Sequence, residues 1–133
     1  MDTAETPTAR YTLRSDGIIL QRIKSGARQE LKDAQENMEA FLRLAAGQKR
    51  LLLVDLRESG PSGRGVREYY AENSTRLLAS AFLVGSSLSQ MIGNFFINVN
   101  RPASPCRLFT SEQAALLWLK THPQPRASSS ASS

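Results

Sequence analysis

LLLVDL, residues 51–56, is a continuous apolar run that only Asp55 interrupts, and it decides the predicted fold. A run without alternation is typical of a β-strand that is buried on both faces, as in a parallel sheet. A second run of this kind, SAFLV, occupies residues 80–84. Because parallel strands need a crossover connection, the two runs predict an α/β domain with a helix between them.

The sequence before LLLVDL predicts a hairpin followed by a helix. Residues 11–14 and 18–23 are short strand-like segments, and the Asp16-Gly17 pair between them is a strong signal for a two-residue hairpin turn. Apolar residues then recur at helical spacing over residues 31–45. The first two strands are therefore expected to pair antiparallel.

The sequence after LLLVDL alternates between helix and strand. Ser87 and Thr110 each precede a glutamine by three residues, which is the capping-box pattern that opens a helix. The fold class predicted is α/β: a single mixed sheet of about five strands, with an N-terminal antiparallel hairpin, the remaining strands parallel, and about four helices. The later elements are expected at residues 66–77 (helix), 80–84 (strand), 87–99 (helix), 106–109 (strand) and 110–118 (helix).

The chain length of 133 residues fits one domain, which we expect over residues 10–121. Residues 1–9 are polar and lack periodicity, so they are expected to form a flexible arm. Residues 122–133 are rich in proline and serine, which predicts a disordered tail. No signal peptide is recognisable and no apolar stretch approaches the roughly 20 residues that span a bilayer, so we expect no membrane partner and a cytoplasmic location.

The net charge is +5 and the sequence pI is about 9.9, a balance that suits a nucleic-acid partner. The distribution of the charges argues against one. The basic residues are scattered, and Lys49-Arg50 is the only adjacent basic pair. No basic stretch is interleaved with aromatic residues as in single-strand binders, so nucleic-acid binding is not expected.

The residues that catalysis or metal binding would need are scarce. Cys106 is the only cysteine, which excludes an intramolecular disulfide and a cysteine-based zinc site. The only histidine, His122, lies in the predicted tail, where it cannot pair with a nucleophile. The glycine-rich segment at residues 60–65 lacks the lysine and the spacing of a phosphate-binding loop. We therefore expect no enzyme activity, no cofactor and no metal.

Polar residues gather where the parallel strands should end. Asp55 and Arg57 follow the first buried run, while Ser62, Ser87 and Thr110 lie where helices should begin. Helix N-termini at the carboxyl edge of such a sheet favour anions, so these positions are candidates for binding a partner or an anion. Two plainer interpretations stay open: the hydroxyls are ordinary helix caps, and Asp55 accepts hydrogen bonds from the next loop. The remaining candidates in this loop are Ser59, Gly63, Arg64 and Arg67.

Several segments resemble the STAS family (sulphate transporter and anti-sigma-factor antagonist), in its branch of small, stand-alone, SpoIIAA-like bacterial domains. The segments that carry the resemblance are LLLVDL at 51–56, PSGRGVREYY at 61–70, SAFLVGSSLSQMIGNFF at 80–96 and PCRLFTSEQAALLWL at 105–119. The resemblance implies a mixed sheet with four helices. It also implies a non-enzymatic regulatory module that binds a protein partner, such as an anti-sigma kinase-like protein in a partner-switching pathway.

The resemblance further implies that Ser62 is a switch serine that a partner kinase phosphorylates. Ser62 begins a Ser-Gly-x-Gly-x segment like that of the family, although Gly60-Pro61 stands where the family has Asp-Ser. Arg64 or Arg67 would then pair with the phosphate. The alternative function is a small-ligand domain that binds a nucleotide, an anion or a lipid at the carboxyl ends of the parallel strands.

The run Phe95-Phe96-Ile97 is apolar at three successive positions of a predicted helix. Successive helical residues differ in direction by about 100°, so all three cannot face the core. We therefore expect Phe95 and Phe96 to contribute to an interface, either with a protein partner or in a homodimer.

Overall fold

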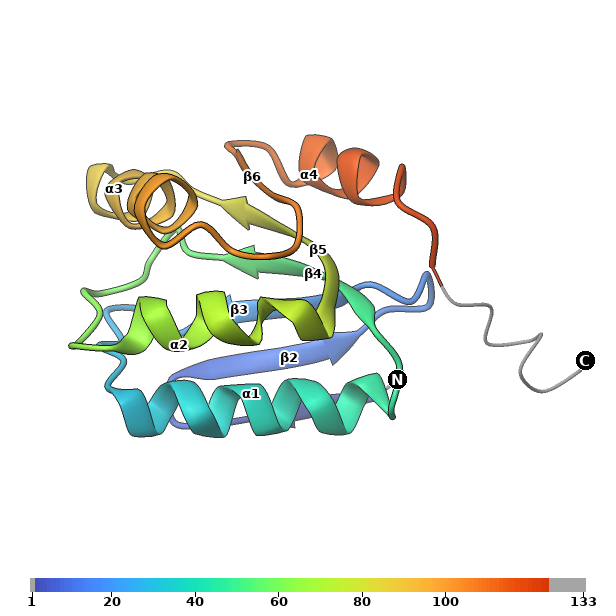
Figure 1. Cartoon of the computed structure of the whole chain (residues 1–133), viewed down its shortest axis with the longest axis horizontal. Coiled ribbons are helices and arrows are strands. Elements are labelled where there is room, and N and C mark those ends of the chain that lie inside the picture. The colour runs from blue at the N-terminus through green and yellow to red at the C-terminus, as the bar shows by residue number, and fades with distance from the viewer. Residues whose placement is uncertain (1, 125–133) are drawn as a thin grey trace, which may run out of the picture.

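The computed structural model describes residues 2–124, which form one six-stranded sheet with helices on both faces (Figure 1). The strands lie in the order of the sequence. They are β1 (Thr3–Glu5), β2 (Ala9–Leu13), β3 (Ile19–Ile23), β4 (Arg50–Asp55), β5 (Leu77–Leu83) and β6 (Cys106–Phe109). The helices are α1 (Leu31–Ala45), α2 (Val66–Glu72), α3 (Ser87–Phe95) and α4 (Glu112–Leu119), with a 3-10 turn η1 (Asn73–Arg76) and a π-helical turn η2 (Phe96–Asn100).

The predicted fold class is confirmed. The strands from β1 to β3 pair antiparallel, and those from β3 to β6 pair parallel through helical crossovers. The Asp16-Gly17 turn forms as expected, with Gly17 at a φ of 85° that an L side chain rarely adopts. The second helix is shorter than predicted, because the chain leaves α2 at Glu72 and Leu77 already begins β5.

The two chain ends are more ordered than expected. Residues 1–9 were predicted to be a flexible arm, but Thr3–Glu5 form the edge strand β1, in which Thr3 pairs with Thr12 and Ala4 packs against the core. The added strand covers the hydrogen-bonding edge of β2. The disordered tail was predicted to begin at residue 122. The structure shows contacts beyond that point, since the Gln124 amide donates a hydrogen bond to the Asp16 carbonyl oxygen. The rest of that tail, from residue 125 onward, lies outside the described residues.

The core has two halves, one on each face of the sheet. Helices α1 and α2 lie across one face, and α3 extends this layer (Figure 1). Helix α4 packs on the opposite face, where Leu119 joins Leu51 and Leu53. Alternation along β4 therefore explains its continuous apolar sequence, because Leu52 and Val54 face α1 and α2 while Leu51 and Leu53 face α4.

None of the helices within residues 2–124 combines the length and the hydropathy that a membrane span requires.

Candidate functional site

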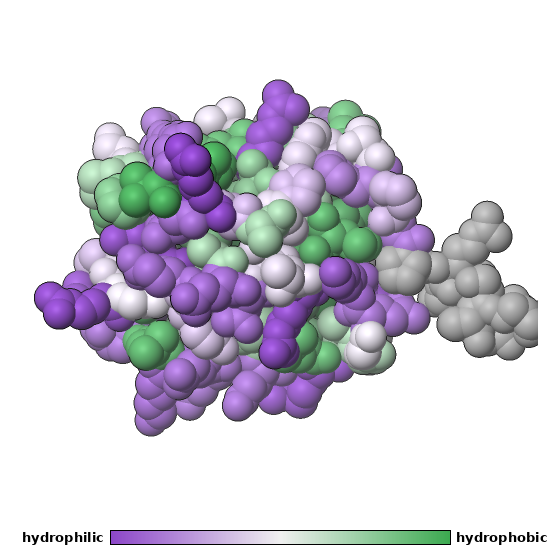
Figure 2. Space-filling view, viewed as in Figure 1, coloured by the Kyte–Doolittle hydropathy of each residue, from purple (hydrophilic) through white to green (hydrophobic). Residues whose placement is uncertain are grey.

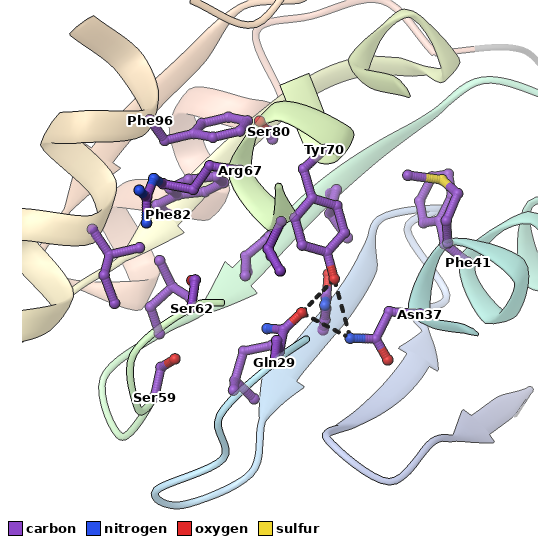
Figure 3. A pocket seen from close by; sticks show the side chains of 18 of the residues that line it. Gln29, Asn37, Phe41, Ser59, Ser62, Arg67, Tyr70, Ser80, Phe82 and Phe96 are labelled. Atoms are coloured by element: carbon purple, nitrogen blue, oxygen red, sulfur yellow. Dashed lines mark hydrogen bonds between the residues drawn. The ribbon is translucent and has the colours of Figure 1, made fainter. Parts of the chain in front are cut away.

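A cavity of about 80 Å³ lies between α2 and the sheet (Figure 3). Helix α2 packs sideways against α1 and η2, which leaves space between its inner side and the strands. Most of the lining is apolar. It includes Leu52, Val54 and Phe82 from the strands, Val66 from α2, Phe41 from α1 and Ile92 from α3.

A hydrogen-bonded group of three side chains forms one side of the cavity. The Tyr70 hydroxyl donates to Oε1 of Gln29 at 2.5 Å. Asn37 Nδ2 lies within hydrogen-bonding distance of both groups, 3.1 Å from the Tyr70 hydroxyl and 3.2 Å from Gln29 Oε1 (Figure 3). Burial raises the pKa of Tyr70, so the phenol is a neutral donor at physiological pH rather than a base.

Asn37 extends this group to the N-terminal segment. Its Oδ1 accepts a hydrogen bond of 2.5 Å from the Thr6 hydroxyl, and its Nδ2 lies 3.0 Å from the Thr8 hydroxyl. Asn37 is 1% exposed, so nearly all of its polar capacity is satisfied by protein. One buried amide on α1 thus connects the β1–β2 turn, the loop before α1 and helix α2.

Two further polar side chains line the cavity. Gln21 on β3 is 6% exposed. Arg67 on α2 is half-buried, and its Nε atom finds no acceptor in the described part of the chain. The guanidinium lies over the Phe95 ring at 4.6 Å from the centroid. The cavity therefore has at its wall a guanidinium that no carboxylate of residues 2–124 neutralises.

Of the candidate residues on the loop over residues 58–67 and the first turn of α2, Ser59, Ser62 and Arg67 line the cavity. Gly63 lies against the loop before α1: its N–H donates to the Gln29 carbonyl at 2.7 Å, and a Cβ at this position would collide with the Glu30 side chain. Arg64 is exposed and does not line the cavity.

Asp55 and Arg57 belong to a separate cluster on the other face of the sheet. Asp55 follows Leu53 in the alternation of β4, so it points away from the cavity that Val54 faces. Its carboxylate accepts hydrogen bonds from the Arg57 backbone and guanidinium at 2.9–3.0 Å and from Arg22 at 3.0 Å. Burial raises the pKa of Asp55, but the hydrogen bonds from Arg57 and the charges of Arg57 and Arg22 outweigh it, so the pKa is lowered.

The hydroxyls predicted as helix caps are not the caps. Ser86, not Ser87, caps α3, and its Oγ accepts from the Ser89 N–H at 3.0 Å. Ser111, not Thr110, caps α4. In both cases the cap is the residue that keeps an extended backbone before the first helical residue.

The expectation for Ser62 is corrected in the same way. Gly65 occupies the N-cap position of α2, without a side-chain hydrogen bond. Of the three hydroxyl residues Ser62, Ser87 and Thr110, Ser62 alone lines the cavity.

The predicted interface residues Phe95 and Phe96 point in different directions. Phe96 is 6% exposed and packs on Phe82 with ring centroids 5.2 Å apart, so it belongs to the core and to the cavity wall. Phe95 is 42% exposed and lies between Met91 and Val99, which are exposed by 60% and 59%. We call Met91, Phe95 and Val99 the α3 ridge; the three residues are spaced four apart and all are exposed.

Sequence reasoning missed Gln21, Gln29, Asn37 and Tyr70 as cavity residues. The sequence could have indicated Asn37, because this polar residue interrupts the buried stripe of Ala34, Met38 and Phe41. It could also have indicated Gln21, a polar residue at an inward position between Ile19 and Ile23. For Gln29 and Tyr70 only the folded chain brings the side chains together. Across residues 2–124 no three His, Cys, Asp or Glu side chains are placed to hold a metal ion.

The fold is similar to that of an uncharacterised protein of the DUF3478 family with a SpoIIAA-like fold from Shewanella loihica PV-4. The two chains share 12% identity with a TM-score of 0.58, and the likeness covers 89% of this chain and 90% of the other. A protein of unknown function from Arthrobacter sp. FB24 shares 28% identity over 83% of this chain and 97% of its own, with a TM-score of 0.33. No curated protein matches the sequence.

The first likeness shows that the chain has a SpoIIAA-like fold, as the resemblance of its segments implied. Residues 11–123 match a family whose description is "Domain of unknown function (DUF7793)". This match spans most of the chain, and the protein therefore belongs to the DUF7793 family.

Proposed function

We infer that the chain is a non-enzymatic regulatory module of the STAS kind, which binds a protein partner through the 58–67 loop, α2 and the α3 ridge. The observation that carries this proposal is the exposed ridge itself. Met91, Phe95 and Val99 present an apolar strip along α3 and the turn η2 that follows it, and Figure 2 shows an apolar patch over α3 with hydrophilic residues at its border. Exposed apolar patches with polar rims are typical of protein-binding surfaces.

Charge next to the ridge gives the surface specificity. Arg67 on α2 lies over the Phe95 ring of α3, and the exposed Arg64 is on the loop before α2. An apolar ridge beside Arg67 suits a partner segment with apolar anchor residues and an acidic neighbour. An anti-sigma kinase-like protein remains the class of partner that the SpoIIAA-like fold favours.

The cluster of Asp55, Arg57 and Arg22 gives less support to the alternative function, a ligand site at the carboxyl ends of the parallel strands. Arg22 and Arg57 already pair with Asp55, and Lys24 pairs with Glu5 at 2.7 Å. A ligand anion would have to displace these carboxylates before it could bind the arginines.

A matched pair of variants tests the docking surface. Phe95→Glu places a charge on the α3 ridge, and Leu117→Glu places the same charge on α4, where Leu117 is 62% exposed on the opposite side of the sheet. Proximity labelling in the native cell should recover a partner with the wild type and with Leu117→Glu. With Phe95→Glu, recovery of that same partner should fall at least about tenfold, since a buried charge costs binding energy.

A second measurement addresses the homodimer. If the ridge joins two copies, sedimentation should give a dimer for the wild type and a monomer for Phe95→Glu. The docking proposal is wrong if Phe95→Glu and Leu117→Glu recover the same proteins in equal amounts and neither variant differs from the wild type in mass.

A further inference from the structure

The cavity beneath α2 combines a mostly apolar lining with an unpartnered cation. The Nε atom of Arg67 lacks a hydrogen-bond partner within residues 2–124, although most buried polar groups in proteins have one. The contrast with the strand-end arginines is direct, since Arg22 and Arg57 both pair with Asp55. A cavity built in this way is suited to a ligand that brings its own acceptor.

We propose that this cavity binds a small carboxylate with a short apolar chain. The chain lies against Leu52, Val54 and Phe82, and the carboxylate lies at Arg67. This site lies beneath the proposed docking surface and shares Arg67 with it, but it is separate from the ends of the parallel strands, and binding of a small carboxylate to the chain alone does not require the docking function.

The charge of the ligand follows from Arg67. Its guanidinium is half-buried beside Phe82 and Phe96 (Figure 3), and no carboxylate of residues 2–124 forms an ion pair with it. A planar guanidinium in a partly desolvated position pairs best with a carboxylate or a phosphate. The hydroxyl of Ser62, a half-buried cavity residue, can add a donor, whereas the Ser59 hydroxyl already donates to the Gly60 carbonyl at 2.9 Å.

The size of the ligand follows from the volume. A water molecule takes up about 30 Å³, so a cavity of about 80 Å³ admits roughly three groups of that size. Pockets for nucleotide-sized ligands are several times larger, which excludes that class from this site. The cavity therefore holds about three carbons of the ligand, and the remaining carbons and the carboxylate extend toward Arg67. Pentanoate and hexanoate have this length. So few atoms give a dissociation constant of about a millimolar.

The test titrates the full chain with sodium hexanoate and follows backbone amide shifts by NMR. Saturable shifts at Val54, Val66 and Arg67 are expected, and acetate and hexylamine at the same concentrations should give none. Arg67→Gln should weaken binding at least about tenfold, as loss of a charged hydrogen bond does. Arg64→Gln is the matched control, since it removes the same charge from an exposed position outside the cavity.

A second variant tests the cavity space and leaves the Arg67 charge in place. Val54→Phe grows into the cavity from the sheet side, so it should abolish hexanoate binding while the amide spectrum stays folded. If it does not fold, Ser62→Leu serves the same purpose from the loop side. The proposal is overturned if hexylamine binds as well as hexanoate, if the filled variant still binds, or if Arg64→Gln weakens binding as much as Arg67→Gln.

Discussion

The Tyr70 hydroxyl donates a 2.5 Å hydrogen bond to Oε1 of Gln29, and this bond ties α2 to the loop before α1. Helix α2 has seven residues, too few to be stable on its own, so it depends on contacts with the rest of the chain. The Tyr70–Gln29 bond and the adjoining Asn37 amide supply polar contacts on the inner side of α2, next to the cavity.

Tyr70→Phe should lower the free energy of unfolding by about 1 kcal/mol, because Gln29 loses a donor and the site is buried. Tyr69→Phe is the matched control, since it removes the same hydroxyl from the neighbouring α2 residue, which does not line the cavity. Urea unfolding of the three proteins measures the difference. Equal losses in the two variants would contradict the assigned role of the hydroxyl.

Asn37→Ala should cost more than Tyr70→Phe, about 2–3 kcal/mol, because it leaves several buried partners without their hydrogen bonds. The double variant should lose less than the sum of the two single losses, since both residues belong to one network. Strict additivity in urea unfolding would show that the two side chains act independently.

The Asp55 cluster predicts a specific dependence of stability on pH. The pKa of Asp55 is lowered in the folded chain, so its contribution is fully present above the ordinary aspartate pKa of about 4 and is lost as the pH falls below that value. Asp55→Asn should therefore be less stable than the wild type at pH 7, and the gap should shrink between about pH 4 and pH 2. Thermal unfolding across that range measures it; a gap that stays constant down to pH 2 contradicts the prediction.

Most of the fold could be predicted because it depends on local patterns. The alternation of buried runs with helical periodicity identified β4, β5 and all four helices, and Asp16-Gly17 fixed the hairpin. The edge strand β1 could not be predicted, because Thr3–Glu5 have no pattern of their own and gain their order by pairing with β2.

The candidate site was less predictable, because it depends on the face of the sheet to which each side chain points and on contacts between residues far apart in the sequence. Asp55 and Ser62 are close in the sequence, but alternation along β4 turns Asp55 to the opposite face from the cavity that Ser62 lines. The Gln29–Tyr70 contact joins residues 41 positions apart, which no local pattern specifies. Capping patterns also erred by one residue, since Ser86 and Ser111 have hydroxyl neighbours that look equally suitable in the sequence.

The Cys106 thiol at the start of β6 should be a poor nucleophile. Burial raises its pKa to about 11, against about 8.5 for a free cysteine. At pH 8 its thiolate population is then lower by a factor of at least about 100, and its reaction with a disulfide reagent should slow accordingly. The same reagent in denaturant gives the reference rate, and similar rates in both conditions would contradict the assignment.

The residues at the start of the predicted tail should contribute to stability. His122 packs edge-on against Trp118 with ring centroids 4.6 Å apart, and Gln124 hydrogen-bonds the Asp16 carbonyl at 3.1 Å. A chain that ends at Thr121 should therefore unfold about 1 kcal/mol more easily than a chain that ends at Gln124. Equal melting temperatures for the two would show that these contacts add nothing.

The resemblance to the STAS family implies a switch at Ser62, which substitutions at this residue can test. Because Gly65 rather than Ser62 is at the N-cap of α2, changes at Ser62 should leave the fold intact. A negative group there would appear among the residues that line the cavity with Arg67, next to the proposed docking surface. Ser62→Asp should therefore reduce recovery of the partner that the wild type labels by about tenfold, while Ser62→Ala should not. Ser111→Asp is the matched control, because Ser111 is an exposed cap of α4, on the other face of the sheet, where aspartate caps as well as serine. The switch is refuted if Ser62→Asp labels the partner as the wild type does, or if Ser111→Asp reduces labelling equally.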